Sequence, residues 1–265
     1  MKELHILVTN DDGIHAEGIQ HLSQVLHQAG QGYRLSIIAP DRERSAVGHA
    51  ITMHQPLRVE KLSFIHNREL SGWAVNGTPS DCVKLAIEAI LDDKPDLVIS
   101  GINRGSNLGT DVLYSGTVSA AVEGLIMGIP SVAVSLTDRG EEKDYLYAAR
   151  FVCNLVPELL NSGIPASTLI NINVPVHTDQ VKGARITSLG TRRYINIFDQ
   201  RIDPRGSIYY WLAGELVDDD PETADSDTKA IRENYISITP VHFSLTDREA
   251  IPGLEKMLQK IPFEL

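Results

Sequence analysis

Two adjacent carboxylates, Asp11 and Asp12, directly follow a short apolar run near the start of the chain. Like charges this close repel each other, and both are costly at the end of a strand unless a cation or hydrogen-bond donors neutralise them. Carboxylate, hydroxyl and amide oxygens suit Mg²⁺ or Mn²⁺ better than zinc. The pair therefore predicts a divalent-metal site, although Asp-Asp-Gly is as readily a plain turn before a helix N-cap.

A second candidate feature is the segment Ser115-Gly116-Thr117, which precedes a predicted helix. Free backbone N–H groups and two hydroxyls at a helix N-terminus suit an anion, whereas the same residues without a ligand make an ordinary N-cap. A metal site and an anion-binding helix N-terminus together predict a site for a phosphate ester, held between the cation and the helix. His15, His49 and His54 lie near these loops as candidate proton donors, but surface or satisfied histidines are the more frequent finding.

The elements that must position these residues alternate between β-rich runs and amphipathic helical segments, which predicts a parallel sheet covered on both faces. The expected core strands are Leu4–Thr9, Leu35–Ala39, Leu97–Ser100, Ser131–Leu136 and Leu169–Val174. Ligands bind beyond the carboxyl ends of such strands. Polar residues stand at three of these ends: Asn10 to Gly13; Asp41, Arg42, Arg44 and Ser45; and Gly101, Asn103, Arg104 and Asn107.

Helical spacing of apolar residues predicts the covering helices. The expected helices are a first one on the stripe Ile19 to Ala29, then Thr78 to about Leu91, Thr117–Met127, Tyr145–Leu160 bent or ended by Pro157, and a short amphipathic Ile251–Lys260. Thr52–Val75 is interrupted by Pro56 and favours a hairpin or an edge excursion. Gly101–Gly116 is expected as one long loop, too long for a mere connector.

The regular alternation stops after residue 183, so we expect a catalytic core over residues 1–183 and an arm with a C-terminal helix over residues 184–265. Between Ala184 and Pro240 there are scattered strand-like stretches, Ile208–Leu212 and Tyr235–Thr239, and an acidic loop, Val217–Asp227. Strands without a packed face are marginal in water. The arm therefore predicts association with a further subunit.

Composition and charge exclude several classes of protein. Apolar residues make up 42% of the chain and charged residues 22%, as in globular proteins with a substantial core. The net charge of -11 disfavours nucleic-acid polymers and anionic membranes as partners.

No apolar stretch approaches the roughly 20 residues that span a bilayer, and the N-terminus lacks the pattern of a signal peptide, so a cytoplasmic location is expected. The two cysteines, Cys82 and Cys153, are expected as reduced core thiols.

Missing motifs and rival functions narrow the interpretation further. The chain has no GxGxxG, GxxxxGK[ST] or GxSxG motif, so dinucleotide binding, P-loop NTP hydrolysis and a hydrolase elbow lack their usual support. A signalling receiver also binds Mg²⁺ with an acid pair, but it needs an aspartate at the third strand end, where this chain has Asn103. A non-catalytic nucleotide-binding protein is separated from a phosphatase by whether free phosphate appears.

The motifs at these strand ends resemble the SurE (survival protein E) nucleotidases. The similar segments are VTNDDGIHAEGI from Val8, APDRERSAVG from Ala39, NGTPSDCV from Asn76, SGINRGSNLGTDVLYSGTVSAAVEG from Ser100 and NINVP from Asn171, with GTRRY, DPRG and YISITP further on. The resemblance covers nearly the whole chain. One departure is Glu17, at a position where proline or a small residue is expected.

The resemblance implies a Rossmann-like three-layer α/β core with a mainly parallel sheet, an extended C-terminal hairpin exchanged between subunits, and a homodimer or homotetramer. It also implies one divalent metal ion per subunit, Mg²⁺ or Mn²⁺, held by Asp11, Asp12, Ser45 and Asn103. Asn107 and Ser115 to Thr117 would lie near the phosphate. The implied activity is hydrolysis of nucleoside 5'-monophosphates, with 3'-monophosphates and short polyphosphate as further substrates.

Overall fold

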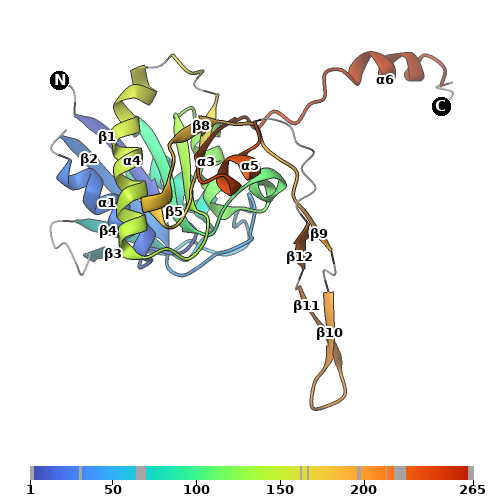
Figure 1. The fold of residues 1–265 in the computed structure, drawn as a ribbon, viewed down its shortest axis with the longest axis horizontal. Coiled ribbons are helices and arrows are strands. Elements are labelled where there is room, and N and C mark those ends of the chain that lie inside the picture. Colours follow the sequence, from blue (N-terminus) through green and yellow to red (C-terminus); the bar gives the residue numbers. More distant parts are fainter. Residues whose placement is uncertain are drawn as a thin grey trace.

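The computed structural model describes residues 3–29, 32–63, 70–161, 163–165, 167–195, 198–212, 214–217 and 225–261. Its body is one large sheet with helices on both faces (Figure 1). In chain order the strands of this sheet are β1 (Leu4–Thr9), β2 (Tyr33–Pro40), β3 (Val59–Ser63), β4 (Ser71–Val75), β5 (Leu97–Arg104), β6 (Ser131–Leu136), β7 (Leu169–Val174), β8 (Ala184–Ile186) and β13 (Ile236–Val241).

Helices α1 (Glu17–Gln28) and α4 (Glu142–Asn161) contact each other, as do α2 (Pro79–Leu85) and α3 (Gly116–Ile126). A π-helical turn, Ala86–Ile90, continues α2, and a 3-10 helix, Gly109–Leu113, precedes α3. Beyond the core lie α5 (Asp227–Arg232) and α6 (Ile251–Leu258), and the arm strands are β9 (Arg193–Ile195), β10 (Phe198–Ile202), β11 (Ile208–Leu212) and β12 (Glu215–Val217).

The sheet order is β3-β4-β2-β1-β5-β6-β7-β13-β8. The six neighbours from β4 to β7 are parallel, whereas β3 runs antiparallel to β4 and β13 antiparallel to β7. The predicted α/β class with a mainly parallel sheet is confirmed, and the weak segment before Val75 forms the edge hairpin β3–β4. Parallel strands place their carboxyl ends at one edge, where loops can converge.

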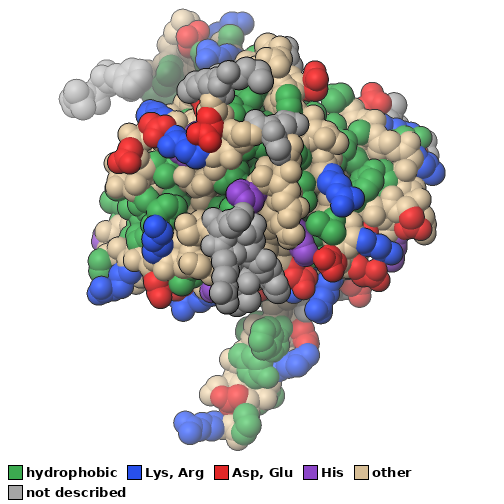
Figure 2. Space-filling model, turned by 90° about the vertical axis from the view of Figure 1, so that its left-hand side faces the viewer, with side chains coloured by type: hydrophobic (Ala, Val, Ile, Leu, Met, Phe, Trp, Pro, Cys, Tyr) green, Lys and Arg blue, Asp and Glu red, His purple; other side chains and the backbone are tan. Residues whose placement is uncertain are grey.

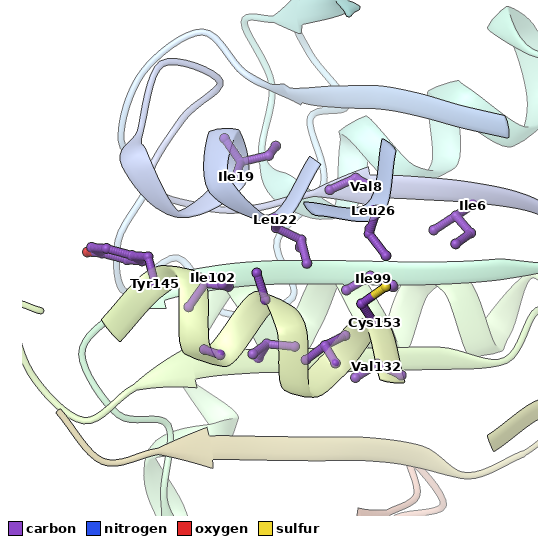
Figure 3. Close-up of a cluster of buried hydrophobic side chains, with 14 of the residues drawn as sticks. Ile6, Val8, Ile19, Leu22, Leu26, Ile99, Ile102, Val132, Tyr145 and Cys153 are labelled. Atoms are coloured by element: carbon purple, nitrogen blue, oxygen red, sulfur yellow. The ribbon is translucent and has the colours of Figure 1, made fainter. Parts of the chain in front are cut away.

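Alternation along β1 separates the two layers of the core, because successive side chains of a strand face opposite sides. Ile6 and Val8 pack in the layer that also holds side chains of α1 and α4, which Figure 3 shows together with Cys153. Leu7 packs in the other layer with Cys82 of α2 and Ala120 of α3. Both cysteines are free and buried, as expected.

Two predicted elements are corrected by the structure. The segment Gly101–Gly116 is not one loop, because after a bulge β5 pairs with β6 as far as Arg104 and the 3-10 helix follows. Helix α4 begins at Glu142 and continues through Pro157 to Asn161, so this proline does not end it. The helix buries most of its apolar stripe before Pro157, and this packing offsets the missing hydrogen bond of the proline.

The expected arm is also shorter than predicted. Strands β8 and β13 pair with each other and with β7 in the main sheet, so Tyr235–Thr239 belongs to the body and not to the arm. Within the described ranges, β9 to β12 form the two-stranded ribbons that project from the body (Figure 1). The boundary between residues 183 and 184 stays a prediction. Part of the acidic loop Val217–Asp227 lies outside the described residues, and its end forms the start of α5. Within the described part of the chain, no helix is long and apolar enough to cross a membrane.

Gly18 fixes the distance between α1 and the strand beneath it. A Cβ at this position would lie 1.9 Å from the backbone oxygen of Ile102 in β5. Because neither backbone can yield without moving α1, we expect Gly18→Ala to lower the free energy of unfolding by about 3 kcal/mol, measured by urea denaturation.

The matched control is Gly253→Ala in α6, where an added Cβ meets nothing within 4 Å. Alanine is the better helix former, so this change leaves stability unaltered or raises it by up to about 1 kcal/mol. Equal losses in the two variants would contradict the close packing of α1.

Candidate active site

Hydrogen bonds join the carboxyl end of β1 to the loop after β2, to the end of β5 and to α3. The backbone N–H of Arg44 donates to the carbonyl oxygen of Asp11 at 2.7 Å. The backbone N–H of Arg104 donates to Asp12 Oδ2 at 2.9 Å. Thr117 Oγ1 donates to Asp11 Oδ1 at 2.5 Å. The polar groups predicted at the strand ends therefore meet at one edge of the sheet.

Asp11 is the more deeply buried of the two acids. It is 5% exposed, and burial raises the pKa of its carboxyl from 3.8 to about 6. The neighbouring charge of Asp12 raises this pKa further, and hydrogen bonding from Thr117 opposes the shift. A Cβ on Gly116 would lie 2.8 Å from Asp11 Cβ, so the glycine lets α3 approach the carboxylate.

Asp12 is half-buried beside Asp11, and burial raises the pKa of its carboxyl as well. The backbone N–H and the guanidinium of Arg104 favour the ionised form, while the charge of Glu43 disfavours it. Two adjacent carboxyls with raised pKa values form a site whose charge a bound cation would stabilise. The unfavourable ionisation of these two carboxyls, together with the oxygen donors around them, fits a hard divalent ion.

Ser45 and Asn103 are each adjacent in sequence to an arginine that is hydrogen-bonded to the acid pair. Arg44 contacts Asp11 and Arg104 contacts Asp12, so the loop after β2 and the end of β5 bring their neighbours Ser45 and Asn103 to the same edge. Ser45 Oγ donates to Glu43 Oε1 at 2.7 Å, and Asn103 Nδ2 donates to the oxygen of Gly105 at 2.7 Å. With its nitrogen engaged, Asn103 retains its amide oxygen as an acceptor for a cation.

Over the described ranges, no group of three or more His, Cys, Asp and Glu side chains is arranged to hold a metal ion. The proposed ligand set has only two carboxylates and relies on a hydroxyl and an amide oxygen for the rest. Carboxylate, hydroxyl and amide oxygens are the donor types that suit Mg²⁺ or Mn²⁺.

The start of α3 is capped by Ser115 and lies beside the acid pair. Ser115 is the N-cap, and its hydroxyl accepts from the backbone N–H of Val118 at 3.1 Å. Thr117 directs its hydroxyl at Asp11, which links the helix N-terminus to the acid pair. The N-cap interpretation is therefore correct for Ser115, and the end of the helix still lies beside the carboxylate where an anion would meet its dipole.

Asn107 is placed differently from Ser115 to Thr117. It is buried, and its Nδ2 donates to Ser135 Oγ at 2.8 Å. Its backbone oxygen accepts from Asn171 Nδ2 at 2.9 Å and from Asn173 Nδ2 at 3.0 Å. These bonds fasten the segment after β5 to β6 and β7, and a phosphate contact by Asn107 stays a prediction.

The candidate histidines have separate environments. His15 and His54 are exposed, whereas His49 Nε2 lies 2.7 Å from Glu123 Oε2 in α3. Sequence reasoning missed Glu123, although an acid within the apolar helix Thr117–Met127 is a signal for a buried partner. It also missed the asparagines of β7, whose signal is the alternation of Asn and Ile in an otherwise apolar strand.

The ionisation of Asp11 sets a pH dependence of stability. A folded pKa of about 6, raised above 3.8, means that the protonated form stabilises the fold and that this contribution is lost as the pH rises through about 6. The shift corresponds to roughly 3 kcal/mol. We expect Asp11→Asn to raise the free energy of unfolding of the metal-free protein by about that amount at pH 8, with a gain shrinking toward zero near pH 4. Urea denaturation across this range checks it, and a pH-independent difference would show that Asp11 does not titrate as described.

Comparison with known proteins shows which family the chain resembles. The family described as survival protein SurE matches residues 6–196. A protein named 5'-nucleotidase SurE from Pelotomaculum thermopropionicum is 54% identical over 256 residues, which cover 97% of this chain and 96% of that protein. One of the same name from Carboxydothermus hydrogenoformans is 54% identical over 260 residues, 97% of each chain.

A solved structure agrees with these sequence matches. The crystal structure of the SurE protein from Aquifex aeolicus has a TM-score of 0.80 and 38% sequence identity to this chain, and the match covers 96% of this chain and 99% of that one. The motifs found at the strand ends, the family match and this shared fold agree, and the chain belongs to the SurE family.

Proposed function

We propose that this protein is a 5'-nucleotidase that hydrolyses nucleoside 5'-monophosphates to nucleoside and phosphate with a divalent metal ion. The observation that carries the chemistry is the contact between Asp11 and Thr117, which places an acid pair against the N-terminus of α3. Two relatives named 5'-nucleotidase SurE are 54% identical to this chain over nearly their full length, and this supports the substrate class.

In this proposal Asp11, Asp12, Ser45 and Asn103 hold one Mg²⁺ or Mn²⁺ ion. A bound cation of this kind supplies positive charge to a phosphate oxygen and makes a nearby water more acidic. Asp11, whose pKa burial raises to about 6, is suited to accept a proton from the attacking water at neutral pH. The Thr117 hydroxyl keeps its carboxylate in one orientation.

Residues at the start of α3 meet the charge of the transferring phosphoryl group. The water oxygen forms a bond to phosphorus while the ester bond to the nucleoside oxygen breaks, and negative charge spreads over the equatorial oxygens. The leaving nucleoside oxygen takes up a proton from solvent, which balances the proton that the water gives to Asp11. Backbone N–H groups of the segment Ser115 to Thr117 lie at a helix N-terminus, where such charge is stabilised. Asn107 completes the proposed phosphate-binding set.

Phosphate release from a panel of substrates tests this function. We expect release from nucleoside 5'-monophosphates to exceed release from 3'-monophosphates, short polyphosphate and p-nitrophenyl phosphate, measured as kcat/KM. A protein that binds the nucleotides but releases no phosphate with any divalent metal would be a nucleotide-binding protein and not an enzyme.

We further propose that the chain forms a homodimer or homotetramer through its arm. Exposed apolar side chains on β11 include Ile208, Trp211 and Leu212, and two-stranded ribbons alone are marginal in water. Figure 2 shows hydrophobic side chains on the arm where it extends below the body. Light scattering of the eluted protein gives the mass, and a monomer at micromolar concentration would refute this proposal. A cytoplasmic location stays a prediction.

A further inference from the structure

A buried carboxylate in α3 takes no part in the mechanism above. The side chain of Glu123 is 6% exposed, and its two oxygens contact His49 Nε2 at 2.7 Å and Lys84 Nζ at 3.4 Å. Burying a charge is costly unless the charge is paired, and these two contacts pair it. Chiefly through the hydrogen bond from His49, the pKa of the Glu123 carboxyl is lowered, so the group is ionised at neutral pH.

The histidine belongs to the loop that carries Ser45. This loop leaves β2 at Pro40, and its first half is fastened by Arg44, which donates its backbone N–H to Asp11 and its guanidinium to the oxygen of Asn76 at 2.7 Å. Its second half is fastened to the α3 segment. The N–H of Gly48 donates to the oxygen of Tyr114 at 3.0 Å, and His49 follows with its bond to Glu123.

The backbone between the two fastenings is strained. Ala46, the residue after Ser45, has a φ of 53°. A residue with a Cβ adopts this left-handed conformation only at a cost in free energy, and the conformation persists only where the surroundings impose it. The bonds from Gly48 to Tyr114 and from His49 to Glu123 are among the contacts that hold the chain after Ser45 in this conformation.

We propose that His49 is a positioning residue, whose bond to Glu123 holds Ser45 at the acid pair and thereby sets the affinity of the site for its divalent cation. This inference rests on the proposed function, because Ser45 is a ligand only there. In this proposal His49 acts through its bond to Glu123 and not by contacting the substrate or the cation. It joins the loop after β2 to α3, the helix whose N-terminus faces the phosphate in the proposed function. The distance between the loop that carries Ser45 and the start of α3 is therefore held constant.

Equilibrium binding of Mn²⁺ to the metal-stripped, full-length protein tests the role, with free Mn²⁺ measured by electron paramagnetic resonance. We expect His49→Ala to raise the dissociation constant about tenfold, as for other residues that orient metal ligands. At saturating Mn²⁺ its kcat stays within about twofold of wild type, since no reacting group is lost. His49→Gln restores the affinity, because the glutamine Nε2 can donate to Glu123.

The control is Lys84→Met, which removes the other partner of the same carboxylate from α2 and leaves the loop untouched. Its Mn²⁺ affinity should equal that of wild type. Unchanged affinity in His49→Ala, or an equal loss in Lys84→Met, would reduce the His49 contact to a structural ion pair and overturn the inference. If His49→Ala does not fold, His49→Asn against His49→Gln gives the same contrast, because the shorter amide cannot reach Glu123. A wild-type protein that binds no Mn²⁺ overturns the proposed metal site itself.

Discussion

We expect replacement of Asp11 by asparagine to lower kcat for a nucleoside 5'-monophosphate by about 10³-fold at pH 7.5. Asparagine cannot accept a proton from water and removes one negative charge from the acid pair, and loss of a positioned base alone is worth roughly 10²- to 10⁴-fold. The fold persists, because the amide oxygen can still accept from Thr117 Oγ1, which lies 2.5 Å from Asp11 Oδ1. Initial rates of phosphate release at saturating metal measure the change.

Asp247→Asn is the matched control for this loss. Asp247 is exposed between β13 and α6, and its carboxylate accepts from the backbone N–H groups of Glu249 at 2.9 Å and Ala250 at 3.2 Å. Its activity should remain within about twofold of wild type, as for surface substitutions in general. If Asp11→Asn kept wild-type turnover with unchanged metal dependence, Asp11 would be neither the base nor a ligand.

Thr117→Val has the second-largest expected effect, a loss of about 10- to 100-fold in kcat/KM. Valine has nearly the shape of threonine but removes the hydroxyl that bonds Asp11. Outer groups that orient metal-binding carboxylates commonly contribute this much. The same change removes a hydrogen bond that lowers the pKa of the Asp11 carboxyl, so the pH profile should move to higher pH.

Thr117→Ser separates the hydroxyl from the methyl group. Serine keeps the donor, so its activity should lie within about fivefold of wild type while valine loses far more. Similar losses in Ser and Val variants would assign the effect to packing at the start of α3, and an active valine variant would show that Asp11 needs no orientation from Thr117.

Local patterns were sufficient to predict the elements that carry the acid pair. The apolar run before Asn10, the helical stripe from Ile19 and the N-cap signals around Thr78 and Ser115 are short-range features, and each produced the expected element. Parallel pairing then follows from the alternation of strands and helices. The convergence of Asp11, Asp12 and the α3 N-terminus is a consequence of that topology.

Long-range pairing could not be read from the chain. β8 has three residues, and nothing in Ala184–Ile186 indicates that it adds to β13 at the edge of the main sheet. Helix α5 carried a local signal that was missed, since the Ser226 side chain caps it by accepting from the N–H of Lys229. The burial of Asn107 was hidden too, because a Gly- and Asn-rich segment is typical of an exposed loop.

The pairing of His49 with Glu123 shows the same limit for side chains. The two residues are 74 positions apart, and each alone is as compatible with a surface charge as with a buried pair. Their contact depends on how the loop after β2 lies across α3. Strain at Ala46 likewise appears only in the folded backbone.

The central claim is that a metal ion on the acid pair enables nucleotide hydrolysis, and metal removal and replacement tests it most directly. Wild type and Asp11→Asn are stripped with EDTA, and phosphate release from a nucleoside 5'-monophosphate is followed as Mg²⁺ or Mn²⁺ is added back. The account predicts no release from stripped wild type, saturable recovery with either ion, and no comparable recovery in Asp11→Asn. Full activity of the stripped wild type, or equal recovery in both proteins, would contradict it.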